Sequence, residues 1–178
     1  MTGAHDATPA VRLRRVEDHD LDAFFEHQAD PLAVEMAAFP ARDRDQFTAH
    51  WAKIRADDTL VVRTIVADGE VAGNIGSWPQ DGQQFLGYWV GREFWGRGVA
   101  TQALALLAEE VSVRPLYAHV VVHNLGSIRV LEKCGFVRVA PPTKGDDGVE
   151  EVLFLLEARG RSESPCPVGP GRDERGGV

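Results

Sequence analysis

A pair of glycines between a strand-like run and a helix-like segment is the feature that most constrains this chain. Residues 85–90 are apolar and rich in side chains that favour strands, and residues 97–111 have the apolar spacing of a helix. The turn between them reads Trp-Gly-Arg-Gly-Val-Ala-Thr over 95–101. Glycines at such a turn let a ligand approach the backbone, and the helix start offers N–H groups and a positive dipole to an anion. The pattern therefore predicts a phosphate-binding loop.

The segments before this loop predict helices followed by an antiparallel meander. After a short strand-like segment at 11–14, apolar side chains recur at helical spacing over 18–29 and 43–56, and Pro31 and Pro40 break the chain between these two helices. Three β-rich runs joined by turn sequences follow, at 60–67, 71–78 and 83–90.

The segments after the loop predict a change of topology. The strand ending at Val90, the helix over 97–111 and the apolar run 116–122 form a βαβ unit, whose strands are expected to run parallel with a right-handed crossover. A further helix is expected over 125–133, with Gly135 as its C-cap. Strands at 136–139 and 152–156 complete the sheet, so the predicted fold class is α+β with a mixed sheet.

Size and composition favour one globular domain. The chain has 178 residues, of which 44% are hydrophobic and 26% are charged, values that are ordinary for a globular protein. The small and polar residues 1–9 predict a flexible arm, and the Gly, Pro and charged residues of 159–178 predict a disordered tail. The folded domain is therefore expected at 10–158.

Charge, apolar runs and cysteine content indicate which partners and which location to expect. The formal net charge of −8 and the lack of a Lys/Arg cluster argue against a nucleic-acid partner and favour a cationic substrate such as an amine. No apolar run approaches the ~20 residues of a membrane helix, and no signal-peptide pattern is present. The two cysteines, Cys134 and Cys166, form no disulfide framework. The expected location is the cytoplasm.

Two familiar phosphate-binding patterns fit this loop poorly. A dinucleotide fingerprint needs a third glycine where Thr101 stands, and an acidic residue about twenty positions later, whereas 111–121 contains neither Asp nor Glu. A P-loop needs Gly-Lys followed by Ser or Thr, which this turn lacks.

A second motif, after the loop, indicates a different phosphate ligand. Residues 124–136 read Asn-Leu-Gly-Ser-Ile-Arg-Val-Leu-Glu-Lys-Cys-Gly-Phe. Together with Tyr-Trp-Val at 88–90 and the loop at 95–101, this motif closely resembles the GNAT superfamily of acetyl-CoA-dependent N-acetyltransferases. More narrowly, it is similar to the branch that includes ribosomal-protein N-terminal acetyltransferases, of which Trp95 is typical. The resemblance implies a mixed central sheet of about six to seven strands with helices on both faces.

The resemblance also implies which residues bind acetyl-CoA. The glycine loop would hold the pyrophosphate through backbone N–H groups, with a further contact from the Arg97 side chain, and splayed strands would offer backbone groups to the pantetheine arm. The implied coenzyme-binding residues are Tyr88, Trp89, Val90, Gly96, Arg97, Gly98, Val99, Ala100, Thr101 and Asn124. Each has a structural alternative: a tight turn, a solvated Arg97, a plain core strand, and a helix N-cap at Asn124.

The catalytic groups are less well defined by the sequence. Ser127 matches the serine that the branch places near the leaving sulfur, where it would hydrogen-bond the thiolate or act as an acid. An alkylammonium must lose a proton before it attacks, and the candidate bases are Glu93, His119, His123 and His50, with water as an alternative. His119 and His123 would lie about 13 Å apart on a strand, too far to share a metal, so no metal is expected.

The sequence does not identify the amine acceptor. The resemblance places it between the first two helices and the sheet, where Phe39 and Trp51 would line its site, unless both are ordinary core residues. The acceptor is expected to be a small molecule or a protein N-terminus, and the sheet edges near the C-terminus are compatible with a homodimer. The alternatives are a non-catalytic coenzyme A-binding or regulatory module on the same fold and a nucleotide-binding protein that uses the glycine loop alone.

Overall fold

A computed structural model describes residues 8–145 and 147–158 of the chain. Residues 1–7 of the expected arm and the whole expected tail, 159–178, lie outside the described residues. Pro9, the last residue of the expected arm, is buried, and its carbonyl accepts a hydrogen bond of 3.0 Å from the Gln102 side chain.

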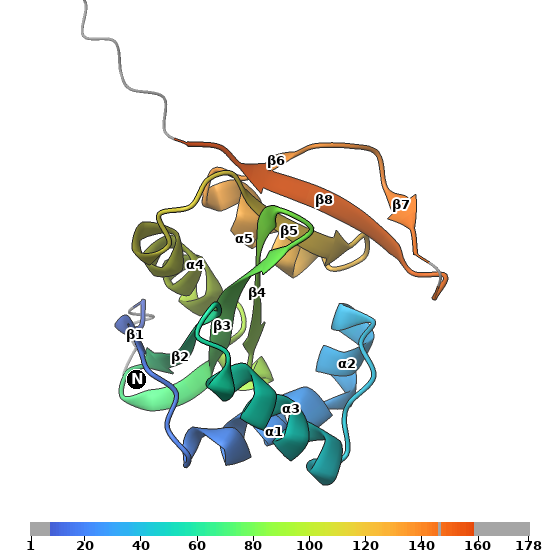
Figure 1. The fold of residues 1–178 in the computed structure, drawn as a ribbon. Coiled ribbons are helices and arrows are strands. Elements are labelled where there is room, and N and C mark those ends of the chain that lie inside the picture. Colours follow the sequence, from blue (N-terminus) through green and yellow to red (C-terminus); the bar gives the residue numbers. More distant parts are fainter. Residues whose placement is uncertain (1–7, 146, 159–178) are drawn as a thin grey trace, which may run out of the picture.

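The described part of the chain forms one mixed sheet (Figure 1). Its strands are β1 (Val11–Arg14), β2 (Val61–Ala67), β3 (Glu70–Gln80), β4 (Gln83–Val90), β5 (Leu116–Val121), β6 (Val137–Arg138), β7 (Thr143–Lys144) and β8 (Glu150–Leu156). The order across the sheet is β1-β2-β3-β4-β5-β8-β6, with β7 also on β8, and only the β4–β5 pair is parallel. This confirms the α+β class and the meander followed by a βαβ unit. The two-residue β7 is the strand that the sequence did not predict.

Helices cover both faces of this sheet, as predicted. They are α1 (Asp20–Ala29), α2 (Pro31–Ala37), α3 (Arg44–Ala56), the 3₁₀ helix η1 (Arg92–Phe94), α4 (Val99–Glu110) and α5 (Leu125–Lys133). Leu104 of α4 and Leu131 of α5 are fully buried in the larger core, together with Ile75 of the sheet. Phe24 of α1 and Trp51 of α3 belong to a second core cluster on the other face.

Helix α2 corrects the expectation that Pro31 only breaks the chain. Proline is tolerated at the first position of a helix because the N–H that it lacks would have no helical partner there. The Asp30 carboxylate caps this helix by accepting hydrogen bonds from the N–H groups of Leu32 (2.9 Å) and Ala33 (3.2 Å). A capping aspartate followed by proline therefore starts a short helix between α1 and α3.

The hairpin between β3 and β4 is tighter than predicted. Pro79 and Gln80, expected in the turn, continue β3 and pair with β4. The turn consists of Asp81 and Gly82, whose φ angles of 52° and 77° suit the two-residue turns that match strand twist.

The parallel pair of strands separates early, and this separation positions the site. β4 and β5 pair only at Gln84 with Leu116 and at Phe85 with Tyr117. On its other edge β4 stays paired with β3 as far as Val90. Residues 86–90 of β4 therefore have no strand partner on the β5 side.

A buried ion pair ties the start of α1 to the sheet. Asp20 is fully buried, and its carboxylate accepts hydrogen bonds from the Arg14 guanidinium (2.6 and 2.7 Å), the Thr64 hydroxyl (2.6 Å) and the Glu17 N–H (2.9 Å). Burial alone would raise the pKa of Asp20, but the hydrogen bonds from Arg14, Thr64 and Glu17 outweigh it and lower the pKa to about 2.

Candidate active site

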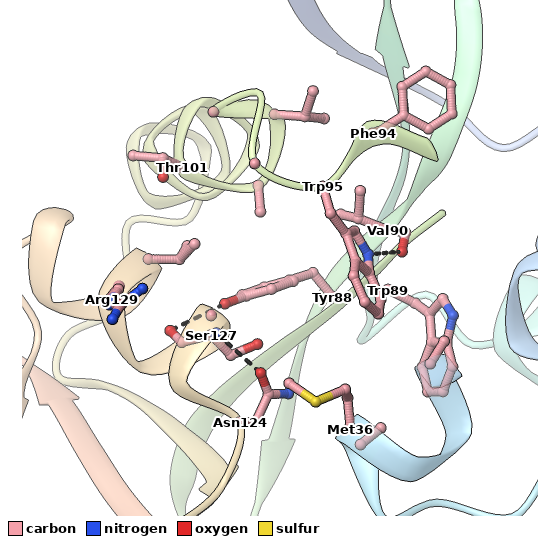
Figure 2. Close-up of a pocket in the computed structure, with 18 of the residues that line it drawn as sticks. Met36, Tyr88, Trp89, Val90, Phe94, Trp95, Thr101, Asn124, Ser127 and Arg129 are labelled. Carbon is pink, nitrogen blue, oxygen red and sulfur yellow. Dashed lines mark hydrogen bonds between the residues drawn. The ribbon is translucent and has the colours of Figure 1, made fainter. Parts of the chain in front are cut away.

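A pocket of about 380 Å³ lies between the end of β4, the glycine loop, α2 and α5 (Figure 2). This volume is within the range of small-molecule sites, about 300–1,000 Å³. The pocket is lined by Ala33, Met36, Ala37, Tyr88, Trp89, Val90, Phe94, Trp95, Gly96, Gly98, Val99, Ala100, Thr101, Asn124, Gly126, Ser127, Arg129, Val130 and Lys133.

The glycine loop brings the start of α4 to this pocket. Gly96 and Gly98 have φ angles of 70° and 77°, a left-handed conformation that favours glycine. Gly98 is the N-cap of α4, and the first helical hydrogen bond runs from the Gln102 N–H to its carbonyl, at 3.1 Å. The N–H groups of residues 99–101 come before this first bond and so have no partner within the helix. All three residues line the pocket. The site therefore has the N–H groups and dipole that an anion needs.

The end of β4 forms a second wall. Tyr88, Trp89 and Val90 line the pocket on the stretch that lacks a β5 partner. The Trp95 indole N–H donates to the Val90 carbonyl at 2.8 Å, as Figure 2 shows, and so holds the loop against β4. The Trp89 indole N–H donates to the His27 carbonyl of α1 at 3.0 Å.

Asn124 and Ser127 face the pocket from the start of α5. The Asn124 side-chain carbonyl accepts a hydrogen bond from the Ser127 N–H at 3.1 Å, so Asn124 is the N-cap of α5 and a pocket residue at once. The Tyr88 hydroxyl donates to the Ser127 carbonyl at 3.4 Å (Figure 2). Burial raises the pKa of Tyr88 to about 12, which keeps the phenol protonated near neutral pH.

Several lining residues were not predicted from the sequence. Ala33, Met36 and Ala37 come from α2, the helix that the proline pattern concealed. Arg129 and Lys133 of α5 lie four residues apart and add positive charge to the wall opposite α2. Basic residues spaced by one helical turn after Asn124 are a signal that the sequence contained.

The structure does not place the Arg97 side chain in the pocket. Its guanidinium lies 3.4 Å from the Asp68 carboxylate and 5.6 Å from the centre of the Phe94 ring. The Arg97 side chain thus pairs with the β2–β3 turn, and its expected contact with a phosphate stays a prediction.

None of the four candidate bases lines this pocket. His50 of α3 packs edge-on against Trp51, and burial lowers its pKa, as do the nearby positive charges. The Glu93 carboxylate is exposed and lies 3.4 Å from Nε2 of the buried His27. His123 Nε2 is 3.0 Å from a backbone carbonyl of α2.

The fourth candidate base, His119, lines a second and smaller pocket of about 140 Å³. This pocket shares Ala37, Tyr88, Asn124 and Ser127 with the larger one. The two pockets are therefore adjacent, and Ser127 lies between them.

Neither residue expected at the acceptor site lines these pockets. Trp51 is 5% exposed and packs in the core against Phe24, with ring centres 4.9 Å apart, so its role is helix packing. Phe39 is exposed, and the Arg42 guanidinium lies 4.7 Å from the centre of its ring. The helical spacing that singled out Trp51 arises from core packing.

Two absences apply to the described residues, 8–145 and 147–158. No group of three or more His, Cys, Asp or Glu side chains is arranged to hold a metal ion. No helix among them is both long and apolar enough to cross a membrane.

Comparison of sequences identifies the family. A profile described as "Acetyltransferase (GNAT) domain" matches residues 10–137. A probable N-acetyltransferase of Bacillus subtilis (strain 168), YjcK, is 39% identical over 56 residues, which are 29% of this chain and 31% of that protein. The alignment thus spans about a third of the curated relative.

Comparison of structures agrees on the fold. A GNAT-family acetyltransferase from Bacillus anthracis matches with a TM-score of 0.74 and 16% identity, over 85% of this chain and 96% of that one. Spermidine N-acetyltransferase from Vibrio cholerae, in complex with CoA and spermine, matches with a TM-score of 0.73 and 14% identity, over 83% and 95%. AAC(6')-Ib, in complex with ribostamycin and coenzyme A, matches with a TM-score of 0.71 and 20% identity, over 87% and 99%. The profile match covers most of the chain, and in the structure a helix start and an unpaired strand edge meet at one pocket. The chain therefore belongs to the GNAT acetyltransferase family.

Proposed function

We propose that this protein transfers an acetyl group from acetyl-CoA to a primary amine by direct attack. The observation that supports this most is the meeting, in one pocket, of the free start of α4 and the unpaired edge of β4. The first suits a pyrophosphate and the second suits the amide groups of a pantetheine arm. The solved neighbours include complexes with CoA.

The residues present fit such a donor. Backbone N–H groups of 96–101 would hold the pyrophosphate, and Arg129 would add a charge-assisted hydrogen bond to a phosphate. The edge of β4 at 88–90 would pair with the pantetheine arm, beside the Asn124 amide.

The chemistry then needs few side chains. The amine nitrogen attacks the thioester carbonyl, and a backbone N–H in 88–90 stabilises the oxyanion of the tetrahedral intermediate. Ser127 would hydrogen-bond the departing thiolate, and the nearby Tyr88 phenol is a second hydroxyl at this point. A thiol with an ordinary pKa of ~8.5 leaves without a strong acid.

Two classes of acceptor follow from different observations. The motif at 124–136 and Trp95 favour a protein N-terminus, as in the ribosomal-protein branch. The acidic net charge of −8 favours a cationic small molecule, and the neighbours in complex with spermine and ribostamycin are enzymes with acceptors of that kind.

The proposal is tested by incubating the protein with acetyl-CoA and a set of amines while free thiol is measured. The set comprises spermine, ribostamycin and a peptide with an N-terminal serine. We expect thiol release above the rate with acetyl-CoA alone for at least one amine. Coenzyme A binding without turnover of any amine would support the non-catalytic module instead, and thermal stabilisation by NAD or ATP but not by coenzyme A would overturn the assignment of the pocket.

Arg129→Gln is expected to weaken coenzyme A binding by about tenfold, since it removes one charge-assisted contact to a phosphate. Turnover of S-acetylpantetheine, which has no phosphate, should stay within about twofold of wild type. The control is Arg55→Gln, because Arg55 lies on α3 and pairs with Asp18 at 2.5 Å. Equal loss toward both donors would contradict a phosphate contact from Arg129.

A further inference from the structure

The smaller pocket lies in the gap where β4 and β5 separate. Residues 86–88 of β4 and 118–121 of β5 line it, beyond the last pair that joins the two strands. It shares Tyr88 and Ser127 with the larger pocket. A molecule in the smaller pocket would therefore lie beside Tyr88 and Ser127, where the proposed function puts the thioester.

Two ionisable side chains meet in this pocket. Alternate residues of β5, including Ala118 and Val120, belong to the core against α4 and α5, so His119 faces the opposite side of the sheet. Glu151 of β8 pairs with Val121 of β5, two residues from His119, and therefore shares its face. The His119 Nδ1 atom lies 3.5 Å from the Glu151 Oε2 atom.

The His119 ring lies parallel to the ring of Phe85. It stacks on Phe85, with ring centres 5.3 Å apart and an angle of 5° between the planes, and Phe85 is itself buried. The His119 and Glu151 side chains are 45% and 42% exposed. A proton taken up at this pair therefore has a route to solvent.

The charges of the two pockets are opposite. The larger pocket contains the cationic Arg129 and Lys133 and no carboxylate. Among the described residues that line either pocket, Glu151 supplies the only carboxylate and His119 the only imidazole. The basic pocket suits a polyphosphate donor, and the acidic pocket suits a cation.

We propose that the smaller pocket is the acceptor subsite and takes an aliphatic primary ammonium, attracted by Glu151 and deprotonated by His119. This inference rests on the proposed function. With Nδ1 directed at Glu151, the Nε2 atom of His119 is free to accept a proton.

His119 takes one proton from the ammonium, and the freed lone pair of the nitrogen forms the new N–C bond at the thioester carbonyl. The C–S bond breaks, and its electron pair leaves with the sulfur. The second proton of the nitrogen passes to the thiolate through solvent, and His119 releases its proton to bulk water.

Replacing Glu151 separates cation recognition from donor binding. Glu151→Gln is expected to raise the KM for spermine by about tenfold at pH 7, whereas the KM for acetyl-CoA stays unchanged. Titration calorimetry of spermine into the coenzyme A-bound protein should show the same weakening. The control is Glu150→Gln, which removes the same charge from the neighbouring, exposed residue outside both pockets.

Replacing His119 tests the proton transfer. His119→Gln is expected to lower kcat for spermine by about a hundredfold at pH 7, with little change in spermine binding, as for loss of a general base. The deficit should shrink as the pH approaches ~10, where alkylamines lose the proton without help. Unfolding midpoints near that of wild type would show that the variants are folded.

The outcomes distinguish the two proposals. A wild-type protein that binds coenzyme A but acetylates none of the test amines overturns the proposed function. Turnover by the wild type, with Glu151→Gln equal to Glu150→Gln, overturns the acceptor subsite alone. A His119→Gln deficit that is constant across the pH range overturns the role of His119 as the base.

Discussion

Asp20→Ala is expected to lower the free energy of unfolding by about 3–5 kcal/mol, the usual cost of removing one partner of a buried ion pair. The variant leaves the Arg14 guanidinium, 20% exposed, and the buried Thr64 hydroxyl without the carboxylate that both contact. Urea denaturation measures the loss as a shift of the midpoint at constant slope.

The matched control for this variant is Asp22→Ala. Asp22 is also on α1 and also pairs with an arginine, Arg44, at 2.8 Å, but its side chain is 80% exposed. Exposed pairs contribute about 0–1 kcal/mol. Equal destabilisation by the two variants would contradict the importance of burial.

The same carboxylate makes stability depend on acid. Its pKa is about 2 in the folded protein, below the ordinary value of 3.8. Asp20 therefore binds fewer protons when folded, and its stabilising effect is complete above about pH 4 and is lost as the pH falls toward 2. The shift corresponds to about 2–3 kcal/mol. Between about pH 4 and pH 2, the free energy of unfolding should therefore fall less with pH for Asp20→Ala than for wild type, which urea denaturation at each pH measures.

Gly98→Val is expected to reduce coenzyme A affinity at least tenfold. A β-branched residue at a φ of 77° is strained, so the backbone relaxes and turns the N–H groups of 99–101 away from the pocket. Titration calorimetry with coenzyme A measures the change.

Gly82→Val provides a matched control for this strain. Gly82 has the same φ of 77° and lies in the β3–β4 turn, where no atom comes within 4 Å of an added Cβ. Both variants should lose comparable stability, about 1–3 kcal/mol, but only Gly98→Val should lose coenzyme A. Comparable loss of affinity in both would show that general destabilisation, and not the loop, is responsible.

The elements that the sequence predicted well are those with local start and stop signals. Helix α5 occupies 125–133 as predicted, because Asn124 caps its first turn and Gly135 follows its end at a φ of 87°. Helix α2 was missed since its signals, Asp30 and Pro31, also mark a break in the chain. Strand β7 is only two residues long and depends on pairing with β8, which no local pattern specifies.

The predicted site residues show the same division. The strand end, the glycine loop and the start of α4 are consecutive in the chain, so a local motif specifies one wall of the pocket. Arg97 belongs to that motif, yet its side chain contacts Asp68, which is 29 residues away in the chain. Glu151 had no motif at all, because its proximity to His119 arises only from the β5–β8 pairing.

Only two residue pairs join β4 to β5, so the sheet consists of two parts with few hydrogen bonds between them. On one side lie the meander and its helices, and on the other lie β5, β8, β6 and β7. A donor seated along β4 as proposed takes the place of the missing ladder, so it is part of the architecture as well as a reactant. A ligand that binds only the folded state raises the free energy of unfolding by RT ln(1 + L/Kd), which grows with the ligand concentration L. The protein with its donor bound would then resist proteolysis better than the free protein.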